Sequence, residues 1–307
     1  MKNLNLQNVV GTLETATPIT NQMLSEFFKL CSAPIEKITS NWLPPEGYTL
    51  EKVTINNVPI ERLIPEKGKN GKVILMLHGG AYIWPLLDTN RNLAVLFSQL
   101  GNNAEVINVD YRIAPKYVYP AALEDCITAY TYLLDSGYTG DDILLTGESA
   151  GGGLVLALTL YLKDHNLPLP KGVIALSPWT EVNNTSLSHT LNAKNDIIIG
   201  KQEYPLAQQV YKTLYRANTD FKTPYLSPLY GDYSNFPNLL IQVGTYEMLY
   251  DDSQRVAEKA IAAGCSVTFS SYFGMCHCFQ ELLPNLPESK LAWEEIKTFI
   301  HTCYNFD

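Results

Sequence analysis

The sequence is poor in positive charge and has no long apolar run. Only 22 lysines and arginines stand against 31 aspartates and glutamates in 307 residues, a formal net charge of −9. Phosphate backbones and anionic membranes attract basic proteins, so this balance argues against nucleic acid and membrane partners. No stretch approaches the roughly 18 apolar residues that a membrane-spanning helix needs. The N-terminal residues lack the apolar core of a secretory signal, so we expect a cytoplasmic protein.

Cysteine and histidine are also scarce. The six cysteines are scattered, apart from Cys276 and Cys278 on either side of His277. A chain of this length folds without disulfide staples, so reduced thiols are expected. A zinc site needs four ligands at recognisable spacing, and no second cluster of Cys and His exists. The sequence therefore predicts no metal and no cofactor.

What the sequence does contain is an alternation of short apolar runs and helix-like stretches. Apolar residues make up 46% of the chain and charged residues 17%, which are values typical of globular proteins. The length of 307 residues predicts one domain with an additional segment. The alternation predicts an α/β fold with buried parallel strands joined by helices. Strands are expected within a hairpin at 50–64 and at 73–77, 106–109, 143–146, 173–176, 239–243 and 267–269. Helices are expected at about 23–30, 120–134, 150–162, 251–263 and 288–303.

Two segments fall outside this alternation. Residues 1–45 precede the first strand, and residues 182–232 form an insertion rich in Asn, Thr, Tyr and Pro, with a helix-like stretch at 203–215. The insertion follows a strand whose carboxyl end faces the expected site. We interpret 182–232 as a cap insertion and 1–45 as an N-terminal cap segment, with core parts at 46–181 and 233–307. The alternative is a surface excursion that packs elsewhere.

The motif most indicative of chemistry is Gly147-Glu148-Ser149-Ala150-Gly151. It lies between a strand-like run at 143–146 and a helix-like run at 154–158. In a Gly-x-Ser-x-Gly elbow the tight turn exposes the serine hydroxyl, and the helix start places a backbone N–H beside it. The pentapeptide alone also fits an ordinary strand-to-helix turn. With suitable partners, it predicts acyl transfer by Ser149.

A serine nucleophile needs a base, and the base needs an orienting acid. Among the five histidines, only His277 lies in a loop after the last expected strand. The loop after the preceding strand carries Glu247, Asp251 and Asp252. The two aspartates stand where the next helix begins, and carboxylates there cap N–H groups. We therefore prefer Glu247 as the acid, with Asp251 as the alternative.

Small residues supply the expected oxyanion donors. His78-Gly79-Gly80-Ala81 follows the strand at 73–77, where residues without bulky side chains let backbone N–H groups approach a substrate oxygen. We assign the N–H groups of Gly79, Gly80 and Ala150 to the oxyanion hole. His78 is interpreted as a structural brace for this loop.

These motifs together resemble the hormone-sensitive-lipase-like carboxylesterases, bacterial family IV of the α/β-hydrolases. The resemblance runs from about residue 50 to the C-terminus. It is carried by four motifs in the family's order: His78-Gly79-Gly80-Ala81-Tyr82, Asp110-Tyr111-Arg112-Ile113-Ala114-Pro115, Gly147 to Gly152, and Ser177-Pro178-Trp179. Departures are Ala81 for the third glycine, Glu148 for the elbow's Asp, and Lys116 for Glu. None of them removes a catalytic group.

The resemblance implies an α/β-hydrolase fold: a mostly parallel, eight-stranded twisted sheet with helices on both faces and a helical cap. It implies a serine carboxylesterase with the triad Ser149, His277 and Glu247, and the thirty residues between acid and histidine favour Glu247 over Asp251. It also implies structural roles for Asp110 to Arg112, the arginine bracing loops around the oxyanion turn. The substrate-binding residues expected are Ala81, Tyr82, Trp84, Glu148 and Trp179.

We expect a small-molecule ester substrate with a short to medium acyl chain. An amidase or peptidase on the same scaffold is the nearest alternative, because the same triad cleaves amides when the leaving amine is protonated in place. A non-catalytic ligand-binding homologue is a further alternative, as in plant gibberellin receptors, which have lost the catalytic histidine. By analogy with relatives that dimerise through the last strand, residues 267–272 are the expected interface of a homodimer.

Overall fold

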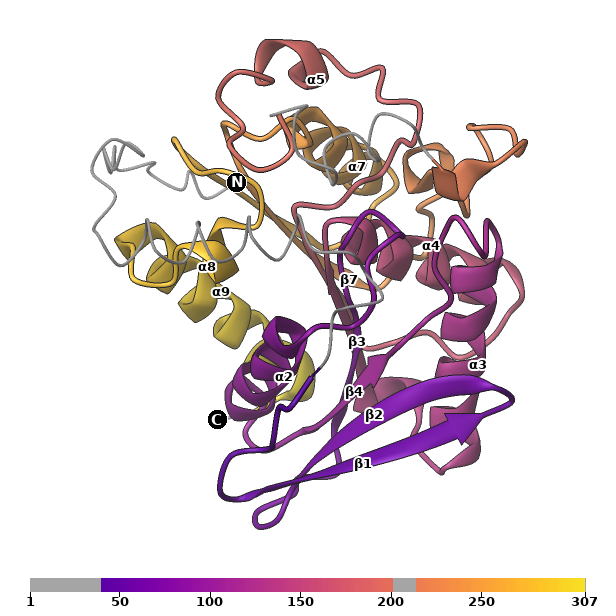
Figure 1. Ribbon diagram of the computed structural model, residues 1–307, viewed down its shortest axis with the longest axis vertical. Helices are drawn as coiled ribbons and strands as arrows, with labels where there is room; N and C mark the ends of the chain where they lie inside the picture. The colour runs from indigo at the N-terminus through magenta and orange to yellow at the C-terminus, as the bar shows by residue number, and fades with distance from the viewer. Residues whose placement is uncertain (1–39, 201–213, 307) are drawn as a thin grey trace.

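One eight-stranded sheet forms the centre of the protein (Figure 1). The structure is a computed structural model, and it describes residues 40–200 and 214–306. The strands are β1 (Tyr48–Ile55), β2 (Val58–Pro65), β3 (Val73–Leu77), β4 (Glu105–Val109), β5 (Ile143–Glu148), β6 (Gly172–Leu176), β7 (Asn238–Gly244) and β8 (Val267–Tyr272). Their order in the sheet is β1-β2-β4-β3-β5-β6-β7-β8. β2 runs antiparallel to both of its neighbours, β1 and β4, and every other pair of neighbouring strands is parallel. The mostly parallel sheet that we predicted is therefore confirmed.

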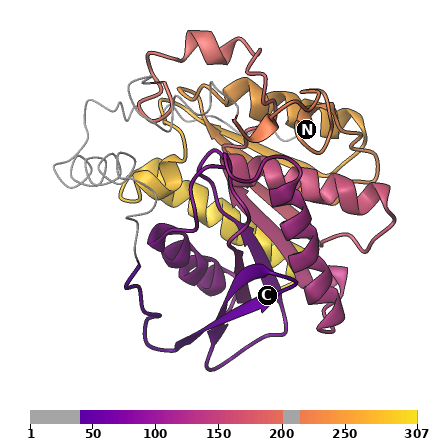
Figure 2. The same ribbon diagram turned by 45° about the vertical axis from the view of Figure 1, so that its right-hand side comes forward.

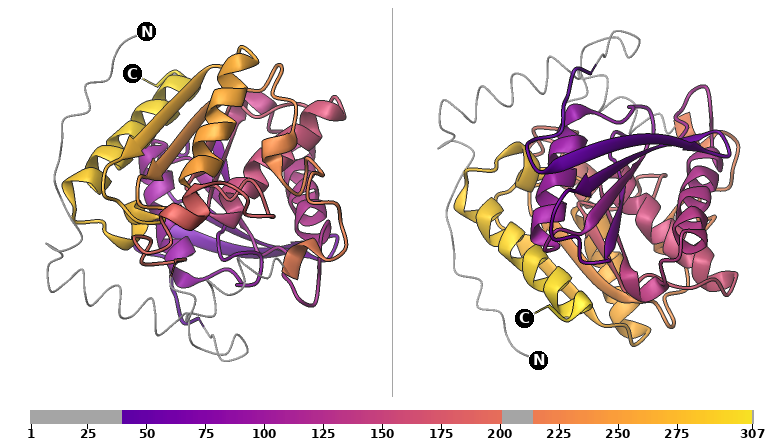
Figure 3. Two further views of the ribbon diagram at one scale, coloured as in Figure 1. Left: turned by 90° about the horizontal axis from the view of Figure 1, so that it is seen from above. Right: turned by 90° about the horizontal axis from the view of Figure 1, so that it is seen from below.

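Helices cover both faces of this sheet. Apolar side chains of α3 (Ala121–Asp135), α4 (Ala150–Asp164) and α7 (Tyr250–Ala262) form the core on one face. Those of α2 (Asp88–Leu100) and α9 (Pro287–Tyr304) form a second core on the other. Figure 3 shows the sheet between α9 on one side and α7 on the other. Every residue of β3, β4, β5 and β6 is buried, as expected for parallel strands covered on both faces.

Helix α2 was missed by the sequence analysis, which left residues 78–105 without a helix. Its first turn is polar, and no residue of the usual N-cap types precedes it. The structure instead has the Asn90 side chain accept a hydrogen bond from the Leu87 N–H at 2.9 Å, while Leu93, Ala94 and Phe97 are buried against the sheet. Burial of these apolar side chains against the sheet therefore stabilises α2. Two short helices were also not predicted: α5 (Ser188–Leu191) and α8 (Phe279–Leu282).

The insertion is described on either side of a gap. Its described parts contain α5 and two short 3₁₀ helices, η4 (Leu214–Arg216) and η5 (Pro228–Tyr230). In Figure 2, α5 lies at the end of the molecule opposite the hairpin of β1 and β2. The helix expected at 23–30 and most of the one expected at 203–215 lie outside the described residues. Among the helices of residues 40–200 and 214–306, none is long and apolar enough to cross a membrane.

Candidate active site

Ser149 stands on a sharp turn between β5 and α4. Its φ of 56° and ψ of −119° depart from both strand and helix geometry. The turn is held by two hydrogen bonds, from Ser149 N to Leu176 O at 2.8 Å and from Trp179 N to Ser149 O at 2.9 Å. A side chain at Gly151 would overlap the carbonyl oxygen of Leu77 at the end of β3. The glycine therefore allows a close approach of two backbones, which lifts the serine above the sheet edge.

His277 reaches Ser149 from the loop after β8. Its Nε2 lies 2.9 Å from Ser149 Oγ, and its Nδ1 lies 2.9 Å from Glu247 Oε2. The two residues come from neighbouring loops that are tied together, because Tyr246 N donates to Met275 O and Gly274 N donates to Thr245 Oγ1. The carboxyl ends of parallel strands share one edge of the sheet, so these loops meet above it. The structure thus brings Ser149, His277 and Glu247 together.

Glu247 is completely buried and its two oxygens have different partners. Oε1 accepts hydrogen bonds from Ser177 Oγ at 2.7 Å and from Gly244 N at 2.5 Å, which leaves Oε2 for His277. Burial opposes the charged form of His277, but the hydrogen bond and the charge of Glu247 outweigh it and raise the pKa of His277 above its ordinary 6.5. This carboxylate both orients the imidazole and favours its protonation.

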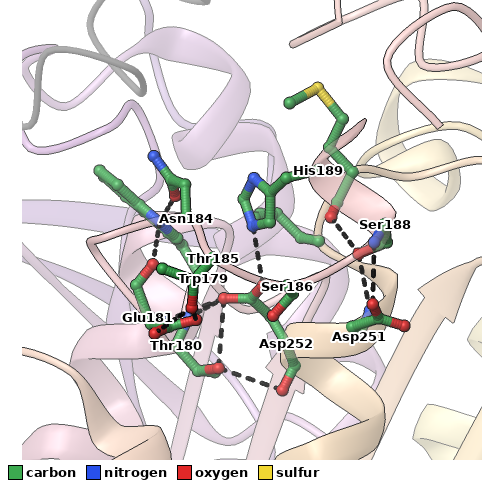
Figure 4. Close-up of polar contacts among 12 residues, drawn as sticks. Trp179, Thr180, Glu181, Asn184, Thr185, Ser186, Ser188, His189, Asp251 and Asp252 are labelled. Carbon is green, nitrogen blue, oxygen red and sulfur yellow. Dashed lines mark hydrogen bonds and ion pairs between the residues drawn. The ribbon is translucent and has the colours of Figure 1, made fainter. Parts of the chain in front are cut away.

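The alternative acid, Asp251, is engaged elsewhere (Figure 4). Its Oδ2 accepts a hydrogen bond from Ser188 N at 2.8 Å, which ties α5 to the first turn of α7. Asp252 accepts hydrogen bonds from the N–H groups of Thr180 and Glu181, and its other oxygen lies 2.9 Å from His189 Nε2. Both aspartates therefore fasten the segment after β6 to α7. They do not cap the N–H groups of α7, so the capping role expected of them is wrong.

The oxyanion turn corrects one assignment. Gly79 N donates a hydrogen bond to Glu148 Oε1 at 2.6 Å, so this N–H is not available to a substrate oxygen. The sequence could not show this, because the acceptor lies 69 residues away on β5. Within the described parts of the chain, the N–H groups of Gly80, Ala81 and Ala150 take part in no hydrogen bond. Gly80, Ala81 and Tyr82 all have positive φ angles, of 112°, 52° and 59°.

The same turn is braced by aromatic contacts. His78 stacks on Tyr111 with ring centroids 4.1 Å apart, its Nδ1 lies 2.8 Å from Gly79 O, and the Tyr111 hydroxyl donates to His78 O at 2.5 Å. Arg112 braces a loop beside the turn and does not contact the turn itself. Its guanidinium instead binds Asp125 and Glu124 on α3, which anchors the loop after β4 to that helix. Tyr111 is therefore the residue of that motif that supports the turn.

A cavity of about 90 Å³ opens beside Ser149 and His277. Of the expected substrate-binding residues, Trp84 and Glu148 line it. Ala81, Tyr82 and Trp179 are not among its described lining residues, which corrects that expectation. The rings of Tyr82 and Trp179 are buried behind the elbow with centroids 6.0 Å apart, and Tyr82 stacks on Tyr215.

Several lining residues were not found from the sequence. They come from α2 and the loop before it, from the insertion, and from α8 and the residue that precedes it: Leu87, Thr89, Asn90, Ile198, Cys278, Glu281 and Leu282. No motif marks them, because their position depends on how these elements meet at the sheet edge. Within the described residues, no group of His, Cys, Asp and Glu side chains is arranged to hold a metal ion.

Comparison with known proteins identifies the fold family. A family model described as the alpha/beta hydrolase fold matches residues 74–281. The chain belongs to the α/β-hydrolase family. It is 35% identical over 252 residues to an acetyl-hydrolase of Streptomyces hygroscopicus, covering 81% of this chain and 82% of that protein. It is 36% identical over 230 residues to an esterase of Acinetobacter venetianus, covering 74% of each.

Solved structures agree with these relatives. An esterase from the bacterial hormone-sensitive lipase family superposes with a TM-score of 0.80 at 31% identity, covering 94% of this chain and 99% of that one. The chain is therefore a hormone-sensitive-lipase-like α/β-hydrolase and a carboxylic ester hydrolase.

Proposed function

We propose that this α/β-hydrolase is a serine carboxylesterase that works through Ser149, His277 and Glu247 and an acyl-enzyme intermediate. The observation that supports the proposal most directly is the chain of two 2.9 Å contacts from Ser149 Oγ through His277 to Glu247 Oε2. A serine hydroxyl is a weak nucleophile at neutral pH, and a base held in one orientation is what it lacks.

In the first half of the reaction, Ser149 Oγ attacks the ester carbonyl carbon while His277 Nε2 takes the hydroxyl proton. The resulting imidazolium is stabilised by Glu247, whose position is fixed by Ser177 and Gly244. The tetrahedral intermediate then collapses, the C–O bond to the alcohol breaks, and His277 gives its proton to the leaving oxygen. In the second half, water attacks the acyl-enzyme with His277 as base and the carboxylic acid leaves.

The oxyanion would be stabilised by the N–H groups of Gly80, Ala81 and Ala150. Gly79 takes a different role, because its hydrogen bond to Glu148 holds the oxyanion turn against the elbow. Losing one oxyanion donor typically costs ~3 kcal/mol of transition-state stabilisation, so the placement of this turn matters for the rate.

The substrates of this reaction are esters with a short to medium acyl chain. The cavity beside Ser149 is small, with apolar walls from Trp84, Leu87, Ile198 and Leu282. Ile198 comes from the insertion, which supports the proposal that residues 182–232 are a cap over the site. The relative in Streptomyces is named an acetyl-hydrolase, in keeping with a small acyl group.

Two measurements test this function. A fluorophosphonate probe should label the protein covalently, and Ser149→Ala should abolish the label while the variant keeps its thermal unfolding transition. A series of p-nitrophenyl esters should give its highest kcat/KM at short to medium acyl length. Persistent labelling of Ser149→Ala would refute the nucleophile, fastest turnover of long chains would refute the substrate range, and matched amides cleaved at comparable rates would favour an amidase.

A further inference from the structure

The cavity beside Ser149 carries two carboxyl groups that transfer no proton and form no bond in the proposed reaction. Glu148 ends β5, is 6% exposed, and its Oε1 accepts hydrogen bonds from Gly79 N and from Asn90 Nδ2 at 3.0 Å. Glu281 lies on α8, four residues after His277, and is partly buried. Within residues 40–200 and 214–306, its carboxyl group has no hydrogen bond or ion pair. Glu281 thus presents a carboxyl group without a protein partner among these residues in the wall of the site.

The surroundings of Glu281 disfavour a negative charge unless a cation enters. Burial, and then the nearby charge of Glu148, raise the pKa of Glu281 well above its ordinary value. Burial also raises the pKa of Glu148 to about 7, against the pull of the Gly79 N–H. No lysine or arginine is among the described residues that line the cavity. A positively charged group bound here would give Glu281 the counter-ion that it lacks among these residues.

The rest of the wall suits a cation with an apolar surface. Trp84, Leu87 and Leu282 offer an aromatic ring and aliphatic side chains beside the two carboxyl groups. Aromatic faces attract ammonium ions, and the attraction grows when water is excluded. We infer that Glu281 is a specificity-determining residue that, with Glu148 and Trp84, selects esters carrying an alkylammonium group in this cavity. The inference rests on the esterase function proposed above and names the substrate class of the same site.

Two other substrate classes fit the wall less well. A hydroxyl-rich group needs several donors and acceptors. Besides the two carboxyl groups and the reacting pair, the described lining residues offer few polar side-chain groups: those of Thr89, Asn90 and Cys278 and the N–H of Trp84. A purely hydrocarbon group would bury the carboxyl of Glu281 without a partner, which is unfavourable. An ammonium ion supplies the missing positive charge, and its alkyl substituents contact the apolar side chains.

The test compares esters that differ only in this charge. Acetylcholine and 3,3-dimethylbutyl acetate have the same shape, with nitrogen replaced by carbon, and place the group in the alcohol. Ethyl 4-(trimethylammonio)butanoate and ethyl 5,5-dimethylhexanoate place it in the acyl chain. We expect kcat/KM to favour the charged member of at least one pair by about tenfold, as one well-placed cation contact provides. Glu281→Gln should remove most of that preference.

Glu294→Gln is the matched control, because Glu294 is an exposed carboxylate on α9 and should leave the preference intact. A second measurement needs no variant: tetramethylammonium should inhibit hydrolysis of 3,3-dimethylbutyl acetate competitively, relative to sodium at equal ionic strength. Equal or faster hydrolysis of both neutral esters, without such inhibition, would overturn the inference and leave the esterase function standing. A preference that survives Glu281→Gln would overturn the role of Glu281. If neither neutral ester is hydrolysed and the fluorophosphonate does not label, both proposals fail.

Discussion

Replacement of Glu247 by glutamine tests the most specific feature of the proposed site. In the wild type, Glu247 Oε1 accepts hydrogen bonds from Ser177 and Gly244, and Oε2 faces His277 Nδ1. A glutamine accepts the hydrogen bonds from Ser177 and Gly244 only if its single carbonyl oxygen takes the place of Oε1. Its NH₂ group then faces His277 Nδ1, which has to accept a hydrogen bond and move its proton to Nε2.

That tautomer points a proton at Ser149 and cannot take the hydroxyl proton. The comparable substitution in serine proteases lowers kcat by about 10⁴-fold, and ~10³- to 10⁴-fold is expected for Glu247→Gln. This range corresponds to ~4–5.5 kcal/mol of lost transition-state stabilisation. KM should change little, because Glu247 is buried behind the histidine and does not line the cavity.

Asp251→Asn is the matched control. Asp251 lies in the first turn of α7 and accepts one hydrogen bond from Ser188 N of α5, so losing its charge should cost about 1 kcal/mol of stability. Its kcat on p-nitrophenyl acetate should stay within about threefold of wild type, since only the helix start is weakened. Thermal unfolding would show that both variants are folded. A severe loss of kcat in folded Asp251→Asn, with Glu247→Gln retaining more than a tenth of the wild-type rate, would refute the assignment of the acid.

The pH dependence provides an independent measurement on the same pair. His277 acts as a base only when it is neutral, so kcat/KM should fall as the pH drops through the pKa of His277. Glu247 raises that pKa above 6.5, so the acidic limb of the wild type should lie above 6.5. In Glu247→Gln the raising charge is absent, and the limb of the residual activity should move to lower pH. An unmoved limb would show that Glu247 does not act on the base.

Three further predictions concern the neighbouring turns. Glu148→Ala should lower kcat/KM by about tenfold, because the Gly79 N–H loses its acceptor and the oxyanion turn loosens. An unchanged or higher rate on p-nitrophenyl acetate would indicate that the Gly79 N–H belongs to the oxyanion hole. Ala81→Gly should raise the free energy of unfolding in urea by ~0.5–1 kcal/mol, since φ is 52° at this position; a loss of stability would contradict this. The double variant Cys276→Ser, Cys278→Ser should retain most of the activity, because burial raises the pKa of both thiols and keeps them protonated. Complete loss of activity in a folded double variant would indicate that a thiol takes part in catalysis.

Local patterns in the sequence were sufficient to predict the sheet and to select Ser149, His277 and Glu247, which the structure brings into contact. The fully apolar runs at β3, β5 and β6 predict buried parallel strands, because only strands covered on both faces are apolar throughout. Helix α2 was missed, because its polar first turn gives no start signal and its burial against the sheet is a tertiary effect. Hydrophobic periodicity identifies a helix or strand when the pattern lies in that segment's own residues. It fails when contacts with residues far away in the sequence stabilise the segment.

The sequence alone determined that this chain forms a parallel sheet with a serine on a strand-to-helix turn, since both depend on residues that are neighbours in the chain. Only the tertiary structure decided that Gly79 binds Glu148, that Arg112 binds α3, and that Glu281 lines the cavity. Such contacts join segments separated by many residues, as the 128 residues between Ser149 and His277 do. Which partner each polar group finds depends on the distances set when the loops meet above the sheet edge, and no local pattern contains those distances.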